Sequence, residues 1–338
     1  MVYLVLESDI VKNAQRNSFK FNPVAAAIAV AITSQFSANV AQAGAGFAQG
    51  TVRTYYANSP AGPATQLDAT TGASTIRADG SGLPVVRDTG KALRKFVDTL
   101  PGIPGITPAN LGVNNLGQYI PLAVAEKWVD LNGITTADDY YEIAAVEFSE
   151  KMHSDLPKAT RLRGYVQLST ARNPGKKIAL KYPDGTAITD AAGTPVFAFD
   201  NPHHLGPIIR SAKGTAVRVK FTNYLPVGGA LFLPVDTTIT GAGFGPDGLT
   251  PYTQNRASIR LVGGQAPWIS AGSPHQWVAP AGETAAYTAG LGKGVSAQNV
   301  PDMADPGPGS STLYFPNDMS ARFMFYQDRT SGLTRLNA

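Results

Sequence analysis

Short runs of alternating apolar and polar residues, separated by turn clusters, constrain the fold of this chain more than any other feature. Val217, Val219 and Phe221 alternate with polar residues, which predicts a half-buried strand that ends at Asn223. Further short runs that predict strands span residues 140–148, 164–168, 177–180, 258–262 and 321–326, and turn clusters lie at 173–175, 183–185 and 305–309. Strands in succession without intervening helices predict an all-β fold, a β-sandwich or Greek-key barrel.

The composition agrees with this fold class and excludes several kinds of site. The 338 residues include 35 Gly and 25 Pro, and only 15% are charged, which is typical of a turn-rich β protein. Without cysteine the chain cannot form a disulfide, a Cys-ligated zinc site, an iron–sulfur cluster or a blue-copper centre. The net charge of +4 is small, and basic residues do not cluster with aromatic residues along the sequence, so no nucleic-acid partner is expected.

The amino-terminal residues 1–43 have the pattern of an export signal. Lys12, Arg16 and Lys20 precede a short apolar core at 24–32, and Ala41-Gln42-Ala43 is followed by the predicted cleavage point before Gly44. The apolar stretch at residues 1–10, ahead of the basic stretch, is unusual and suggests an extended signal or a misassigned start codon. The alternative is a buried Ala-rich helix. Because no other segment is long and apolar enough to span a membrane, we expect the mature chain in the periplasm or outside a bacterial cell.

The mature chain is predicted to have two parts. Residues 44–139 form an extension, rich in Gly, Ala and Thr at first and then partly helical. Leu93, Phe96, Val97 and Leu100 have helical spacing, and a second short helix is predicted over Leu122–Val129. Residues 140–338 form the β domain.

Several short motifs have the residue types of functional sites. Residues 243–248 match G-x-G-x-x-G, but Pro246 and the residues after it do not open a helix, so a dinucleotide site is not predicted. His203 and His204 could bind a metal, yet adjacent side chains on an extended segment point to opposite faces, which favours a solvated pair. His275 is predicted to be a hydrogen-bonded loop residue, with an isolated metal or proton site as the alternative.

Longer phrases resemble a known family. The run from Leu205 to Arg210, followed by Lys213-Gly214-Thr215 and the predicted strand to Asn223, resembles the first cupredoxin (plastocyanin-like) domain of multicopper oxidases. Residues 252–277 are similar to that family's H-x-H-G-G-x-x-P-W-I-S segment, and residues 315–337 to its S-A-R-L-M-F-Y-H-D-H phrase. The resemblance covers about residues 140–338 and is nearest to large bacterial laccase or manganese-oxidase types. It implies a cupredoxin-like Greek-key fold.

The departures from the family pattern fall on its copper ligands. The four histidines of H-x-H and H-D-H correspond to Arg260, Val262, Gln327 and Arg329 in this chain. Valine has no donor atom, arginine has no free lone pair and carries a positive charge, and glutamine is a weak ligand. No copper or other cofactor is therefore expected at these positions. Asp328, which matches the family's aspartate, is predicted to pair with Arg329 or Arg260 and balance their charge.

Three functions are consistent with these residues. The first is an exported multicopper-oxidase-like protein without the trinuclear copper ligands, which would be noncatalytic, with a binding or structural role or as a degraded paralogue. The second is one part of a split copper-dependent oxidase, completed by another chain with further cupredoxin domains. The third is a copper-carrying module that uses His153, His203, His204 or His275 at a new site. The substrate, the protein partner and the oligomeric state do not follow from the sequence.

Overall fold

The computed structural model describes residues 2–6, 75–76, 84–85, 96–108, 111–228, 230–283 and 292–333. The chain divides into two compact units. The first comprises Met1–Asp9, Leu100–Met152 and Lys158–Ala338, and the second Ile10–Thr99 and His153–Pro157. In the second unit β2 (Thr75–Ile76) pairs antiparallel with β3 (Pro84–Val85).

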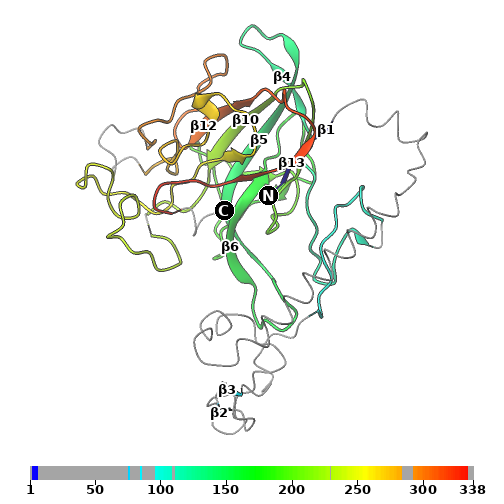
Figure 1. The fold of residues 1–338 in the computed structure, drawn as a ribbon, viewed down its shortest axis with the longest axis vertical. Coiled ribbons are helices and arrows are strands. Elements are labelled where there is room, and N and C mark those ends of the chain that lie inside the picture. The colour runs from blue at the N-terminus through cyan, green and yellow to red at the C-terminus, as the bar shows by residue number, and fades with distance from the viewer. Residues whose placement is uncertain are drawn as a thin grey trace, which may run out of the picture. The chain divides into compact units, whose positions relative to one another are not determined.

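The larger sheet of the first unit is built around one long strand. β5 (Thr135–Glu150) pairs antiparallel with β4 (Glu126–Val129) and with β6 (Thr160–Gln167), and the β5–β6 hairpin extends well beyond the rest of the sheet (Figure 1). On its other edge β5 pairs in parallel with β10 (Val217–Asn223), which pairs antiparallel with β12 (Ser310–Phe315). The strand order is β12-β10-β5-β4, with β6 also on β5.

The second sheet joins segments from both ends of the chain. Its order is β11 (Arg260–Val262), β13 (Arg322–Gln327), β1 (Val2–Leu6) and β9 (Ile209–Ala212). β1 runs antiparallel to β13 and parallel to β9, so it occupies an interior position of this sheet. A small hairpin, β7 (Ile178–Ala179) with β8 (Phe197–Ala198), completes the strands.

The principal core lies between these two sheets. Alternation along each strand turns every second side chain into this core. The larger sheet contributes residues of β5, β6, β10 and β12, and the second sheet contributes residues of β9, β11 and β13. The core side chains of these strands are Tyr141, Ile143, Ala145, Tyr165, Val217, Val219, Phe221, Leu313, Phe315, Ile209, Leu261, Met324 and Tyr326. A second cluster covers the opposite face of β5 and β6 with residues of the segment 178–198. The first unit is therefore a layered, predominantly β structure.

The predicted strands are confirmed. Each of the six alternating runs contains an observed strand, and β10 begins at Val217 and ends at Asn223 as expected. Its polar face is more buried than predicted, because Arg218 lies beneath loops and donates to both carboxylate oxygens of Asp302 at 2.8 Å and to Asp138 at 2.8 Å.

The two predicted helices are wrong. Within the described residues there is no α-helix; a 3₁₀ turn spans Trp268–Ser270, and no helix there is long or apolar enough to cross a membrane. Phe96 and Leu100 are exposed and lie outside any helix, and Phe96 has a φ of 60°, which a helix does not allow. Pairing with β5 draws the segment predicted as Leu122–Val129 into β4, so tertiary contacts override local spacing.

Two predicted segments lie mostly outside the described residues. They are residues 7–43 of the predicted signal and, apart from β2 and β3, residues 44–95 of the predicted extension 44–139. The signal and the domain boundaries stay predictions. Cleavage before Gly44 would remove β1 from its place between β9 and β13.

We expect Tyr165→Phe to lower the free energy of unfolding by about 1–2 kcal/mol at neutral pH. The Tyr165 hydroxyl donates to the carbonyl of Ser258 at 2.5 Å, and its ring contacts Phe221 and Tyr326 in the core. Burial raises the pKa of Tyr165 well above its usual value. Its phenol therefore stabilises the fold fully below about pH 10, and this contribution is lost as the pH rises further.

Urea unfolding of wild type and Tyr165→Phe between neutral and alkaline pH measures both effects. Tyr182→Phe is the control, because the hydroxyl of Tyr182 has no hydrogen bond within the described residues. Identical alkaline profiles for wild type and Tyr165→Phe would contradict the prediction.

We expect Leu4→Pro to destabilise the first unit, since proline removes a backbone donor from the middle of β1. Leu4 faces Phe323 across one ladder and Arg210 across the other. Leu4→Val keeps the N–H and is the control. Thermal unfolding of the full chain reports the difference, and equal melting temperatures for the two variants would rule out an interior β1.

Candidate functional site

The four positions that the sequence comparison singles out lie together on one face of the second sheet. Arg260 is directly opposite Gln327, and Val262 is directly opposite Phe325, across the antiparallel β11–β13 ladder. Directly opposed residues project from the same face of a sheet. Arg329 follows Gln327 at the same parity, so all four positions share this face.

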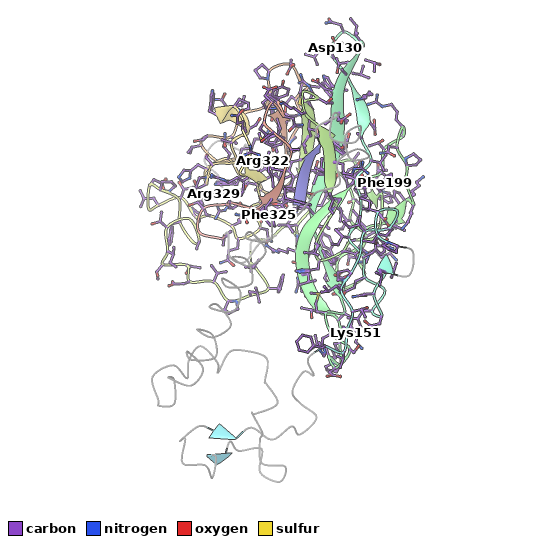
Figure 2. All side chains as sticks on the ribbon, turned by 45° about the vertical axis from the view of Figure 1, so that its right-hand side comes forward. Asp130, Lys151, Phe199, Arg322, Phe325 and Arg329 are labelled. Carbon is purple, nitrogen blue, oxygen red and sulfur yellow. The ribbon has the colours of Figure 1, made fainter. Side chains whose placement is uncertain are left out.

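Alternation along β13 separates a core face from an open face. Met324 and Tyr326 are buried between the sheets, at 1% and 3% exposure. Phe323 and Phe325 project the other way and are 73% and 56% exposed. Figure 2 labels Arg322, Phe325 and Arg329 along this segment. The candidate site is therefore an open surface and not a cleft.

The open face is positively charged and offers few metal donors. Arg260, Arg329 and Arg210 of β9 form no ion pair within the described residues. Val262 is 37% exposed and has only carbon atoms to offer. Of the four side chains only the amide of Gln327 can coordinate a metal, and the neighbouring guanidinium groups repel cations.

Asp328 is a structural residue of the chain beneath this face. It is 1% exposed, and one of its carboxylate oxygens accepts from the N–H of Ser258 at 2.8 Å and from the Thr330 hydroxyl at 2.7 Å. The other accepts from the N–H of Thr330 at 3.0 Å. The predicted ion pair of Asp328 with Arg329 or Arg260 is wrong, because alternation turns the aspartate inward and both arginines outward.

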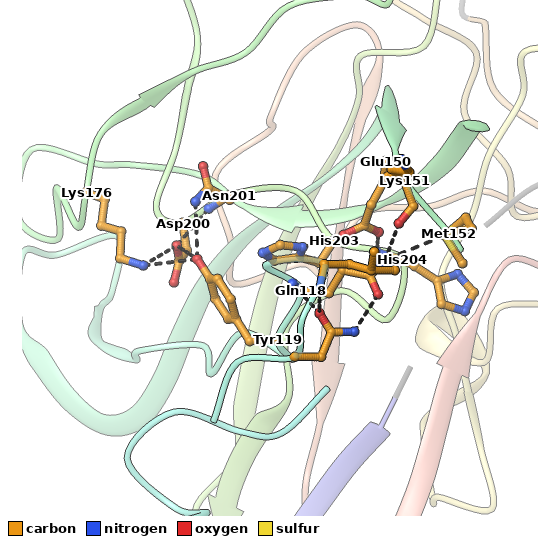
Figure 3. Close-up of polar contacts among 12 residues, drawn as sticks. Gln118, Tyr119, Glu150, Lys151, Met152, Lys176, Asp200, Asn201, His203 and His204 are labelled. Atoms are coloured by element: carbon orange, nitrogen blue, oxygen red, sulfur yellow. Dashed lines mark hydrogen bonds and ion pairs between the residues drawn. The ribbon is translucent and has the colours of Figure 1, made fainter. Parts of the chain in front are cut away.

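The carboxylate of Glu150 contacts both His203 and His204, but the two histidines differ in burial. Glu150, at the end of β5, contacts the His203 ring at 2.6 Å through Nδ1 and accepts the N–H of His204 at 2.8 Å (Figure 3). His203 is 8% exposed, its ring lies edge-on to Tyr119 at 4.2 Å, and its Nε2 is buried without a hydrogen bond to any described residue. His204 is exposed. The prediction of a solvated pair therefore does not hold for His203.

A polar cluster that the sequence did not indicate lies beside His203. The Tyr119 hydroxyl donates to Asp200, and the ammonium of Lys176 lies 2.7 Å from Asp200 and 3.0 Å from the Tyr119 hydroxyl (Figure 3). Partial burial opposes the charge on Lys176, but these hydrogen bonds outweigh it and raise the pKa. The adjoining cavity of about 10 Å³ has room for one water at most, so the cluster is structural.

The other histidines do not form a metal centre. The Nδ1 of His275 is buried and has no hydrogen-bond partner within the described residues, so the predicted hydrogen bond is not found at this atom. The Nε2 of His153, in the second unit, lies 3.7 Å from a carboxylate oxygen of Asp98. Within the part of the chain that the structure describes, no group of three or more His, Asp or Glu side chains could hold a metal ion.

A larger cavity of the first unit also lacks catalytic character. Its volume is about 510 Å³, and it lies among Tyr182, Tyr224, Lys220 and loops that contribute hydroxyls and prolines. Lys220 is paired with Glu142 at 3.2 Å, and burial raises the pKa of Tyr224 to about 12, so this phenol stays neutral at physiological pH. The cavity holds no metal-ligand set among the residues that line it.

The remaining motifs form loops and packing contacts. Residues 243–248 form a turn in which Asp247 accepts the N–H of Leu249 and of Thr250, and no helix follows, as predicted. Trp277 is 1% exposed and packs in the interior, whereas Trp268 is 65% exposed.

Comparison with known proteins reveals a distant similarity to multicopper oxidases. No protein-family model matches the chain. It is 31% identical over 132 residues to the multicopper oxidase LPR1 homolog 1 of Oryza sativa subsp. japonica, a match that covers 39% of this chain and 18% of that protein. A multi-copper oxidase and a laccase of Pediococcus acidilactici align with 63% of the chain, at 15% and 14% identity and TM-scores of 0.28 and 0.27, over 26% and 28% of their own lengths. The chain thus spans less than a fifth of the rice relative.

We expect Asp328→Ala to lower the free energy of unfolding by about 3 kcal/mol or more, because it leaves buried donors of Ser258 and Thr330 without their acceptor. Asp328→Asn retains one acceptor oxygen and should lose less. Asp318→Asn is the control, since Asp318 is exposed. Denaturant unfolding measures all three, and equal stability of Asp328→Ala and wild type would contradict the structural role.

Proposed function

We propose that this chain is an exported, cupredoxin-like, noncatalytic protein of multicopper-oxidase type that acts through the open face of β11 and β13. One observation carries the proposal: Arg260, Val262, Gln327 and Arg329 occupy adjacent positions on one exposed sheet face. The motif phrases that surround these positions support the relationship, and the two arginines and the valine support the loss of copper chemistry. Without copper ligands, this face can still serve a binding or structural role.

The residues of the open face do not fit copper. Cupric ions favour imidazole nitrogen, and this face has no imidazole among the four positions. Any cation there would meet the charges of Arg260 and Arg329, for which no carboxylate partner is present within the described residues. No reaction step through copper can be derived from these side chains.

The split-oxidase alternative accounts for the partial length of the chain relative to the rice protein but leaves the arginines unexplained. It would require another chain to supply copper ligands against two positive charges. The noncatalytic proposal has no such requirement.

We expect the purified full chain to retain no stoichiometric copper after incubation with Cu(II) and dialysis. The variant R260H/V262H/Q327H/R329H should retain copper at least about tenfold more tightly than wild type, since it places four imidazoles on one face. Metal analysis and electron paramagnetic resonance provide the measurement.

The control variant T135H/A137H puts two histidines at the same i, i+2 spacing on exposed positions of β5. Tightly held copper in wild type would overturn the noncatalytic proposal. Equal copper retention by the four-histidine variant and the control would show that these four positions do not converge on a site.

A further inference from the structure

The outer face of the second sheet gathers arginines and apolar side chains from three distant segments. Phe323 and Arg210 lie in one row, because both face Leu4 across its two ladders. Val262 and Phe325 form the next row, and Arg260 and Gln327 the third. Arg329 lies beyond the third row. We name this set, Arg210, Arg260, Val262, Phe323, Phe325, Gln327 and Arg329, the arginine–phenylalanine face.

The strand pattern of β13 is that of a strand covered on both sides. Its apolar run Phe323, Met324, Phe325 and Tyr326 does not alternate with polar residues. Continuous apolar runs are typical of strands buried on both faces, whereas half-exposed strands alternate. Met324 and Tyr326 are buried, but Phe323 and Phe325 remain more than half exposed. The exposed side of β13 therefore has the apolar composition that is typical of a protein–protein interface.

The three arginines of this face have no ion pair within the described residues, whereas four other arginines of that part of the chain do. Among the described residues, Arg161, Arg163, Arg172 and Arg218 each pair with a carboxylate, and so do Lys127, Lys176 and Lys220. No ion pair involves Arg210, Arg260 or Arg329 within that same part of the chain. Arginine and aromatic residues are also the types enriched at the energetic centres of protein interfaces.

We propose that the arginine–phenylalanine face docks an acidic segment of a partner protein, with apolar side chains of the partner on Phe323 and Phe325 and carboxylates on the three arginines. This inference rests on the proposed function, because a copper-bearing face would require different neighbours. A second copy of the chain fits poorly, since two such faces would bring like charges together. A nucleic acid fits less well, because three arginines neutralise too few phosphates for a binding track.

The test uses a short fluorescein-labelled peptide in which aspartate and glutamate alternate with leucine and phenylalanine. Fluorescence anisotropy with the full chain should show binding that weakens as salt is added. R260Q/R329Q should weaken it at least about tenfold, a loss expected when two charge pairs are removed from an interface. K158Q/K181Q changes the charge equally at exposed sites elsewhere and should have no effect.

Apolar contacts are tested in the same assay. F323A/F325A should weaken binding, whereas L131A/I134A, which truncates two other exposed apolar side chains, should not. These exposed positions contribute little to the core, and melting temperatures of all four variants check that they fold.

Each of four results would overturn the proposal: no binding of the acidic peptide, equal binding of its lysine counterpart, equal or tighter binding of an oligo-thymidine, or insensitivity to R260Q/R329Q. Self-association that R260Q/R329Q abolishes, measured by sedimentation, would assign the face to a second copy instead and overturn it as well. Copper analysis of the same samples keeps the two hypotheses apart. Bound copper defeats the proposed function, whereas absent peptide binding without copper defeats the docking inference alone.

Discussion

Burial of the inner faces of two sheets against each other is the constraint on which the rest of the first unit depends. β5 and β10 supply Ile143, Val219 and Phe221 from one side, and β13 supplies Met324 and Tyr326 from the other. Tyr165 joins the layers through its ring and through its hydroxyl on Ser258. Once these residues are inside, strand alternation decides which neighbours face outward.

The exposed face of β13 and β11 is a direct result of that packing. Because Met324 and Tyr326 turn inward, Phe325 and Gln327 must turn outward, beside Val262 and Arg260. Asp328 turns inward again and is held by backbone and hydroxyl donors, so its charge is not available to the arginines. The alternation of inward and outward side chains along this segment thus explains why Asp328 is buried and why the arginines of the exposed face have no carboxylate partner among the described residues.

Strands were the part of the fold that local sequence could predict. Short apolar or alternating runs depend only on neighbouring residues, and the predicted runs at β5, β10 and β13 all form strands. The helix predicted at Leu122–Val129 fails because β4 gains its hydrogen bonds from β5, a partner that spacing cannot specify. The turn at Asp130–Gly133, whose aspartate caps two N–H groups, was the signal that could have indicated a hairpin. The burial of His203 depended on Glu150, which lies 53 residues away.

The sequence by itself determined the absence of cysteine chemistry, the predominance of strands and the residue types at Arg260, Val262, Gln327 and Arg329. These are properties of composition and short-range order. Only the tertiary structure decided that those four positions share one face, that Phe323 and Phe325 lie open beside them, and that Arg210 joins them from a strand more than a hundred residues away from β13. The physical reason is that strand register brings distant segments together, and register is set by burial of a common core.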